Sequence, residues 1–174
     1  MEHPLSLFTH CPRCGSTHFN IHNEKSKQCA DCGFVYYFNS SAATVALIMN
    51  ERNELLVCRR AKEPAKGTLD LPGGFIDMNE TAEEGIAREV KEETGMEVIQ
   101  TDYLFSLPNL YLYSGFTVHT LDIFFRCTVK DTQHYRPMDD AADLYFLPLN
   151  RINPEDFGLG SIRKGVERFL NGAL

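Results

Sequence analysis

The 174-residue chain contains no tryptophan and no apolar run near the roughly 20 residues that cross a bilayer. Its first residues also lack the basic region and apolar stretch of a secretion signal. Positive charge is not in excess, because 17 Lys and Arg stand against 24 Asp and Glu, a formal charge of −7. Non-specific binding to duplex nucleic acid requires clustered cations and is therefore disfavoured. We expect a soluble cytoplasmic protein with no membrane partner and no clear nucleic-acid surface.

The composition of the chain changes near residue 40. Residues 1–40 are rich in Cys, His, Asn, Lys and Ser, whereas residues 41–174 carry the strand-like and helix-like patterns. Hydrophobic residues make up 43% of the chain, which is enough to build a core. We expect a small unit over residues 1–40 and one larger domain over residues 41–174.

Strand and helix patterns are mixed along the larger domain. Apolar segments over residues 42–49 and 55–61 flank a turn and predict a hairpin. Further patterns predict strands around 68–75, 102–107, 118–129 and 143–147, and helices over 82–94 and 161–170. Thr81 and Glu84 have capping-box spacing, and Gly95 suits a left-handed C-terminal cap. Strands mixed with two helices predict an α/β (α+β) sandwich.

Three glutamates share one face of the expected helix 82–94. Glu89, Glu92 and Glu93 stand at i, i+3 and i+4. Like charges this close repel by a few tenths of a kcal/mol per pair, unless a divalent cation lies among them. Carboxylates suit Mg²⁺ or Mn²⁺, which can bridge to phosphate oxygens and activate a water for attack at phosphorus. A solvated acidic helix face explains the same spacing, so the three residues alone leave both readings open.

The neighbouring residues favour the metal site. Gly74 is followed after five residues by Glu80, and after seven more by the run Arg88-Glu89-Val90-Lys91-Glu92-Glu93-Thr94-Gly95-Met96. Residues 74–96 resemble the complete signature of the Nudix hydrolase family, and the resemblance extends over residues 41–170. It implies a Nudix-type α/β/α sandwich with a mixed sheet. It also implies a pyrophosphohydrolase that cleaves a diphosphate bond with Mg²⁺ or Mn²⁺ and activated water.

The resemblance assigns roles to individual residues. The metal ligands that it implies are the backbone carbonyl of Gly73 and the carboxylates of Glu89, Glu92 and Glu93. Arg88 would pair with Glu80 and orient the glutamates. An exposed ion pair worth under ~1 kcal/mol is the alternative for Arg88 and Glu80.

Residues outside the signature are candidates for a base and for substrate binding. By position, the candidates for a general base are Asp139, Asp140 and Asp143, which turn residues of a solvated loop explain as well. The candidates for substrate binding are Arg60, Tyr111, Tyr113 and Phe116. Aromatic faces stack nucleobases, and packing within strands and core is the alternative.

Four cysteines in the first unit have the spacing of a metal site. They form two CxxC pairs, Cys11 with Cys14 and Cys29 with Cys32, separated by fourteen residues. Four thiolates at this spacing match a closed structural Zn²⁺ site, so we expect a zinc ribbon over residues 1–40. Disulfides, a redox pair or an iron centre are the alternatives.

A zinc ribbon followed by such a domain resembles two groups within the family. One is the NADH pyrophosphatases, and the other is a set of ribbon-bearing hydrolases of FAD or ADP-ribose. The SQPWPFPxS motif of the first group is matched at Ser106, Pro108, Tyr111 and Ser114, but its tryptophan and two further prolines are missing. We expect a small nucleoside diphosphate-linked substrate, with NADH, FAD and ADP-ribose all open. The resemblance also implies a homodimer.

A second class of function is a ligand-sensing regulator or binding module that uses the ribbon for partner contact. Basic residues in the ribbon are sparse, which does not suggest a surface that follows a phosphate backbone. A complete set of metal-binding glutamates is also hard to reconcile with a pure sensor. The enzyme is therefore the favoured interpretation.

Overall fold

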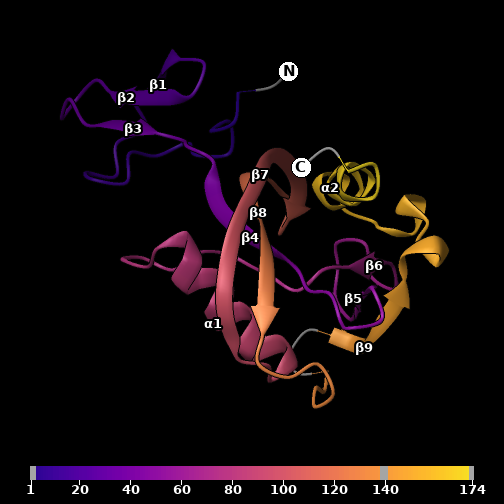
Figure 1. Cartoon of the computed structure of the whole chain (residues 1–174). Helices are drawn as coiled ribbons and strands as arrows, with labels where there is room; N and C mark the ends of the chain where they lie inside the picture. The colour runs from indigo at the N-terminus through magenta and orange to yellow at the C-terminus, as the bar shows by residue number, and fades with distance from the viewer. Residues whose placement is uncertain (1–2, 138–140, 173–174) are drawn as a thin grey trace. The chain divides into compact units, whose positions relative to one another are not determined.

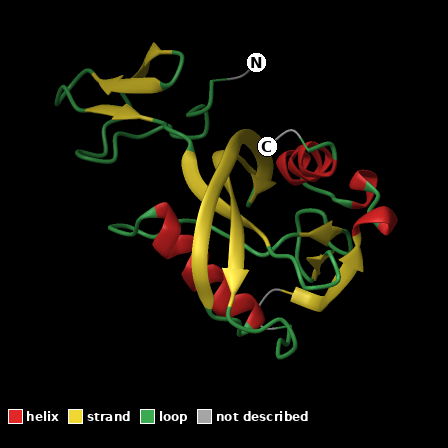
Figure 2. Cartoon of the chain, viewed as in Figure 1, coloured by secondary structure: helices red, strands yellow, loops and turns green. Residues whose placement is uncertain are grey.

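The computed structural model describes residues 3–137 and 141–172. The chain divides into two compact units, Met1–Ser40 and Ser41–Leu174. Figure 1 labels the elements of both units, and Figure 2 colours them by type. Of the helices within the described ranges, none has the length and apolar character required to cross a membrane.

The first unit is a small antiparallel sheet of three strands in the order β1-β2-β3. The strands are β1 (Phe19–Asn23), β2 (Ser26–Cys29) and β3 (Val35–Tyr37). Gly15 and Gly33 follow the second cysteine of each pair with φ of 75° and 71°, in the left-handed region that favours glycine. The buried hydrophobic cluster of this unit consists of Cys11, Phe19 and Cys29, and Leu5 is buried as well. A core this small requires a further source of stability.

Two three-stranded sheets form the framework of the second unit. In one, β8 (Phe116–Val129) lies between β4 (Ser41–Leu47), to which it is parallel, and the antiparallel β7 (Val98–Tyr113). In the other, β5 (Glu54–Arg60) lies between β6 (Leu69–Asp70) and β9 (Ala141–Pro148). The 3-10 turns η1 (Leu149–Arg151) and η2 (Pro154–Asp156) lead from β9 to the last helix. The sheet that contains β8 is mixed, as predicted.

The two helices of the second unit cover opposite faces of the strands. In β4, Val45 belongs to the core cluster that contains Ile162 of α2 (Gly160–Leu170). The next residue, Ala46, belongs to the cluster that contains Val90 of α1 (Ala82–Thr94). Successive strand residues point to opposite faces, so α1 and α2 lie on either side (Figure 1). The predicted α/β/α sandwich is confirmed.

The predicted hairpin of residues 42–49 and 55–61 is wrong in its pairing. The chain does reverse at this turn, where Met49 and Leu55 form a bridge. Beyond that bridge, β4 pairs with β8 and β5 pairs with β6 and β9, in separate sheets. Turn residues specify a local reversal, whereas β8 and β9, the longest partners of β4 and β5, come from far along the chain.

Helix α1 begins and ends where the sequence predicts. The hydroxyl of Thr81 accepts from the N–H of Glu84 at 3.1 Å, and the carboxylate of Glu84 accepts from the N–H of Thr81 at 2.8 Å. Gly95 ends the helix with φ of 77°. Ile86 and Val90 are fully buried, so the helix is held firmly against the strands while it carries the glutamates on another face.

Candidate functional site

Arg88 connects acidic side chains of α1 with Glu80 in the loop before that helix. Its Nε and Nη2 each donate to a different carboxylate oxygen of Glu80 at 2.9 Å. Its Nη1 donates to Glu89 at 2.8 Å and to Glu92 at 3.1 Å, and Nη2 also donates to the carbonyl of Phe75 at 3.0 Å. The side chain of Glu80 is only 15% exposed. This two-point pair is therefore a stronger contact than the exposed ion pair considered as the alternative.

The pKa values of two carboxylates around Arg88, those of Glu80 and Glu89, are shifted in opposite directions. Hydrogen bonds from Arg88 lower the pKa of Glu80. Burial raises the pKa of Glu89, although Arg88 opposes that effect. Glu80 is therefore satisfied by Arg88, whereas a nearby cation would favour the ionised form of Glu89 against the effect of burial.

Two adjacent glycines bring the backbone close to α1. Gly73 has φ of 150°, and a Cβ there would lie 2.1 Å from the carbonyl oxygen of Thr44. A Cβ at Gly74 would lie 2.6 Å from the carboxyl group of Glu89. The N–H of Gly73 donates to Glu93 at 3.0 Å. This glycine turn, Gly73 and Gly74, thus presents bare backbone to two of the three glutamates.

The atoms around the glycine turn fit a hard divalent cation by their chemistry. Carboxylate and carbonyl oxygens are the ligands that Mg²⁺ and Mn²⁺ prefer. Glu89 and Glu92 share Arg88, while Glu93 accepts from Gly73. Within the described ranges, the sulfur atoms of the four cysteines lie within 4.8 Å of one another, whereas the carboxylate oxygens of the three glutamates are not gathered in this way. The metal roles of the glutamates and of the Gly73 carbonyl stay predictions.

A cavity of about 590 Å³ opens beside the glycine turn. Gly73, Gly74 and Glu93 line it together with residues from the strands, which include Asp70, Asn109, Thr120 and Asp122. Its volume lies within the range of roughly 300–1,000 Å³ that is typical of small-molecule sites. A ligand in this cavity can contact the glutamate helix and the strand wall at the same time.

Arg60 and Tyr113, both predicted to bind substrate, line this cavity. Arg60 forms an ion pair with Asp70 at 2.5 Å, so its guanidinium is already engaged. Tyr113 is 62% exposed. Phe116 lies opposite Tyr113 in the register of β7 and β8 and is not among the lining residues. Tyr111 lies on β7, but its side chain falls outside the described part of the structure.

The candidates for a general base remain predictions. Asp139 and Asp140 lie outside the described residues. Asp143 lies on β9, exposed, and accepts from the N–H of Leu144 at 2.9 Å. It is not among the residues that line the cavity. The structure thus places Asp143 within β9, where it is the register partner of Arg59 on β5.

Two buried acids in the cavity wall, Asp70 and Asp122, are not predicted from the signature. Burial raises the pKa of Asp70 against the opposing charge of Arg60, and the charge of Asp122 adds to the rise. A signal for Asp122 exists in the alternation of β8. It occupies the position between the buried Thr120 and Phe124, where a strand facing a core carries apolar or neutral residues. Acids are seldom buried at such a position without a partner.

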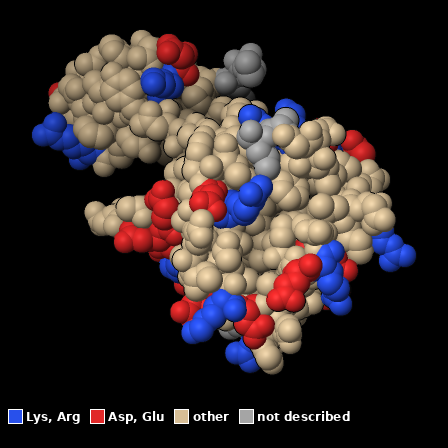
Figure 3. All heavy atoms as spheres, in the orientation of Figure 1, with Lys and Arg blue, Asp and Glu red and all other residues tan. Residues whose placement is uncertain are grey.

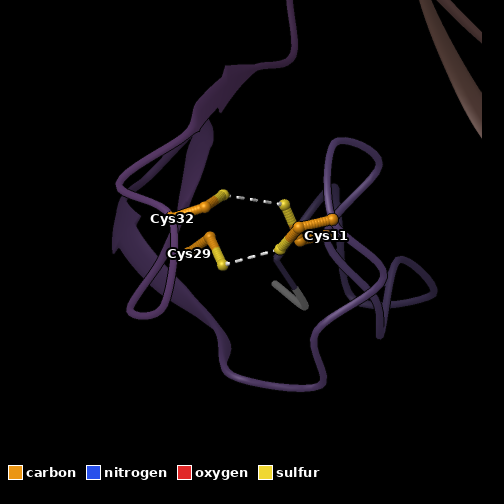
Figure 4. Close-up of side chains that lie close together, drawn as sticks. Cys11, Cys29 and Cys32 are labelled. Carbon is orange, nitrogen blue, oxygen red and sulfur yellow. Dashed lines mark hydrogen bonds between the residues drawn. The ribbon is translucent and has the colours of Figure 1, made fainter.

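The four cysteines of the first unit converge, and Figure 4 labels three of them, Cys11, Cys29 and Cys32. The Sγ atoms of Cys11 and Cys32 are 3.7 Å apart, and those of Cys14 and Cys29 are 3.6 Å apart. Tetrahedral zinc with Zn–S bonds of about 2.3 Å separates its sulfurs by about 3.8 Å. The quartet therefore fits a zinc site, and its spacing is too long for disulfides.

Charges of both signs are mixed on the face drawn in Figure 3. Among the described residues of that face, Lys and Arg side chains form no continuous stripe. A phosphate backbone is normally followed by such a stripe. For the rest of the surface, the expected absence of a nucleic-acid site stays a prediction.

Comparison with known proteins identifies relatives along most of the chain. The model of the NUDIX domain family matches residues 39–168. An ADP-ribose pyrophosphatase of Methanocaldococcus jannaschii is 33% identical over 133 residues, which cover 75% of this chain and 76% of the relative. The NAD-capped RNA hydrolase NudC of Vibrio atlanticus is 32% identical over 106 residues, or 61% of this chain and 39% of the relative. The chain thus spans about two fifths of the length of these NudC relatives.

Solved structures share the fold. A NUDIX hydrolase from Nitrosomonas europaea superposes with a TM-score of 0.73 at 23% identity, over 94% of this chain and 90% of the other. The NUDIX domain of Shewanella oneidensis NrtR, crystallised with ADP ribose, superposes with a TM-score of 0.62 at 17% identity, over 79% and 91%. At these identities the likeness concerns the fold alone.

Proposed function

The chain belongs to the Nudix hydrolase family, and on this premise we propose that it hydrolyses the diphosphate bond of a small nucleoside diphosphate-linked molecule with Mg²⁺ or Mn²⁺. The observation that carries the proposal is the single cavity that joins Glu93 and the glycine turn to a strand wall. ADP-ribose is the preferred candidate, since a relative of which this chain covers 76% is named an ADP-ribose pyrophosphatase. NADH and FAD are further candidates.

The residues of α1 and the glycine turn have different proposed roles in metal binding and in orienting the ligands. The proposed ligands are the carbonyl of Gly73 and the carboxylates of Glu89, Glu92 and Glu93. When bound, the cation neutralises the diphosphate oxygens and lowers the pKa of a water. Arg88 orients two of the carboxylates, and Glu80 holds Arg88 in place. The absence of side chains at the glycine turn lets the diphosphate approach the glutamates.

The strand wall would bind the nucleoside. The exposed ring of Tyr113 at the cavity offers a face on which a base can stack. Arg60 contributes positive charge to a cavity that also holds Asp70, Asp122 and Glu93. Because Arg60 is already paired with Asp70, it serves more to shape the wall than to bind phosphate.

We also propose that the two units have separate tasks. Residues 1–40 form a zinc ribbon in which Cys11, Cys14, Cys29 and Cys32 bind one structural Zn²⁺. Such a closed site stabilises a fold and leaves no position for a substrate. Residues 41–174 form the hydrolase domain.

The test is a hydrolysis assay with ADP-ribose, NADH, FAD, diadenosine polyphosphates and nucleoside triphosphates in Mg²⁺ or Mn²⁺. We expect at least one member to be cleaved to a mononucleotide. Glu93→Gln should lower kcat/KM by roughly 10²–10³-fold, since it removes one preorganised charged group. Glu83→Gln is the matched control, because Glu83 is exposed on the same helix.

Full activity of a folded Glu93→Gln variant would reject the assigned role of Glu93. If no substrate is cleaved with either metal, the hydrolase proposal fails. Tight ADP-ribose binding without cleavage would instead support the ligand-sensing alternative.

A further inference from the structure

A buried carboxylate lies in the strand wall of the cavity, outside the metal-binding face of α1. Asp122 is only 5% exposed and lies on β8, the central strand of its sheet. The hydroxyl of Thr120 donates to its Oδ1 at 2.5 Å, and the hydroxyl of Ser161 donates to its Oδ2 at 2.5 Å. Thr120 and Ser161 are themselves buried, at 3% and 1% exposure. Two fixed hydroxyls thus hold the carboxylate in one orientation.

The carboxylate keeps the capacity to accept further hydrogen bonds. Each carboxylate oxygen has about two acceptor positions, and the two hydroxyls use one on each oxygen. Both donors are neutral, so the negative charge of Asp122 is not neutralised by them. Because Asp122 lines the cavity, a bound molecule can supply the remaining donors. Burying such a group is costly unless those donors arrive.

The register of the strands sets the distance from Asp122 to the glycine turn. Asp122 is the partner of Ala43 on β4, and Ala43 in turn forms a bridge with Phe75, the residue after Gly74. Two strand spacings amount to about 10 Å. A nucleoside can span this separation, so that it reaches Asp122 while its diphosphate lies at the glutamates.

We propose that Asp122 is a specificity-determining residue that accepts two adjacent hydrogen-bond donors of the substrate's nucleoside. Thr120 and Ser161 are positioning residues for its carboxylate. The inference rests on the proposed hydrolysis of a nucleoside diphosphate-linked substrate. Two parts of a nucleoside carry adjacent donors: the 2′,3′-diol of ribose, and a base edge with a ring N–H beside an amino group, as in guanine. In other proteins carboxylates accept from the hydroxyls of ribose and from the amino groups of bases.

Discrimination by the unmodified protein is the first test. It compares kcat/KM for ADP-ribose, its 2′-deoxyadenosine counterpart and its guanosine counterpart. If Asp122 binds the diol, the deoxy compound should be cleaved about 10- to 100-fold less efficiently, because a buried acceptor is left unpaired. If it binds a base edge, the guanosine compound should be preferred by a similar factor while the deoxy compound is tolerated. Equal cleavage of all three would overturn the proposal.

Asp122→Asn is the second test, because the amide keeps the shape and replaces one acceptor with a donor. The variant should lose the discrimination shown by the unmodified protein. Asp102→Asn is the matched control, since Asp102 is an exposed acid on the neighbouring β7. Ser161→Ala should reduce the discrimination partially, and it decides the matter if Asp122→Asn does not fold. Discrimination that survives in folded variants would reject the role of Asp122.

Calorimetric binding of the same three compounds, without added Mg²⁺ or Mn²⁺ and without a chelator, separates this proposal from the proposed activity. If nothing is hydrolysed but binding discriminates and Asp122→Asn abolishes that difference, the hydrolase proposal fails and the role of Asp122 stands. If hydrolysis proceeds without discrimination in binding or in kcat/KM, the hydrolase proposal stands and the role of Asp122 is rejected. Failure to bind any of the three compounds would overturn the role of Asp122.

Discussion

A single guanidinium, that of Arg88, determines how several acids are arranged. It donates to Glu80, Glu89 and Glu92 and to the carbonyl of Phe75. These contacts compensate the mutual repulsion of the carboxylates on one helix face. Of the three acids, Glu80 comes from the loop before α1, so the network also ties that loop to the helix.

We predict that the stabilising effect of Glu80 depends on pH. Contact with Arg88 lowers the pKa of Glu80 in the folded state. A lowered pKa contributes stability that is fully present above the unfolded value of about 4.3 and is lost as pH falls through the folded pKa. Glu80→Gln should therefore lower the melting temperature at pH 7, and the difference from the unmodified protein should shrink below about pH 4.

Thermal melts between pH 3 and pH 8 provide the measurement. Glu97→Gln is a suitable control, because Glu97 is an exposed acid whose contact with Lys130 is 3.4 Å long. It should change the melting temperature little at any pH. A constant difference for Glu80→Gln across this range would contradict the role of its ionised form.

At the level of elements, α2 packs unusually closely on β8. A Cβ added at Gly165 would lie 2.3 Å from the ring of Phe124. That ring is fully buried and stacks on Phe105 with centroids 4.8 Å apart, so it has little room to move. The glycine is therefore required by packing, although it weakens the helix itself.

We predict that Gly165→Ala destabilises the protein. Overpacking costs about 1–3 kcal/mol, whereas alanine gains about 1 kcal/mol over glycine in a helix. The net loss should reach up to about 2 kcal/mol in urea unfolding. Gly160→Ala is the control, because the nearest atom to its added Cβ is 3.9 Å away. If Gly165→Ala is as stable as the unmodified protein or more stable, the ring of Phe124 on β8 can move to make room for the added methyl group.

Other elements of the second unit show what the sequence can and cannot predict. Local patterns are sufficient for α1, since both of its caps, at Thr81 and Gly95, involve neighbours within one turn. Strand partners depend on contacts far along the chain, so the hairpin expected for β4 and β5 was wrong. The glutamates follow a fixed motif, so the sequence alone is enough to predict them as metal ligands, whereas Asp122 joins the cavity only through the pairing of β4 with β8.

For the whole molecule, the two units differ in how they are stabilised. The first has a buried core of Cys11, Phe19 and Cys29, while the second has two larger clusters on either side of its strands. With so few apolar contacts, the first unit would gain most of its stability from the proposed zinc. The core of the second unit would not depend on that metal.

We predict about one zinc per chain in metal analysis of the purified protein. Cys14→Ser should lower the zinc content, and a strong chelator should remove protection from hydrogen exchange in residues 1–40 while residues 41–174 stay protected. Cys127→Ala is the control, because Cys127 is buried in the second unit and should leave the zinc content unchanged. A folded first unit without zinc would reject this prediction.

The cavity takes its glutamate end from α1 and the glycine turn, and its other end from the strands. No side chain that we assign to bond cleavage lies on β8, and none that we assign to nucleoside recognition lies on α1. Substitutions in the strands can therefore change which molecule is cleaved without altering how the bond is broken. This separation makes the protein a favourable starting point for directed evolution, in which a library restricted to the strand wall explores new substrates on an unchanged reaction.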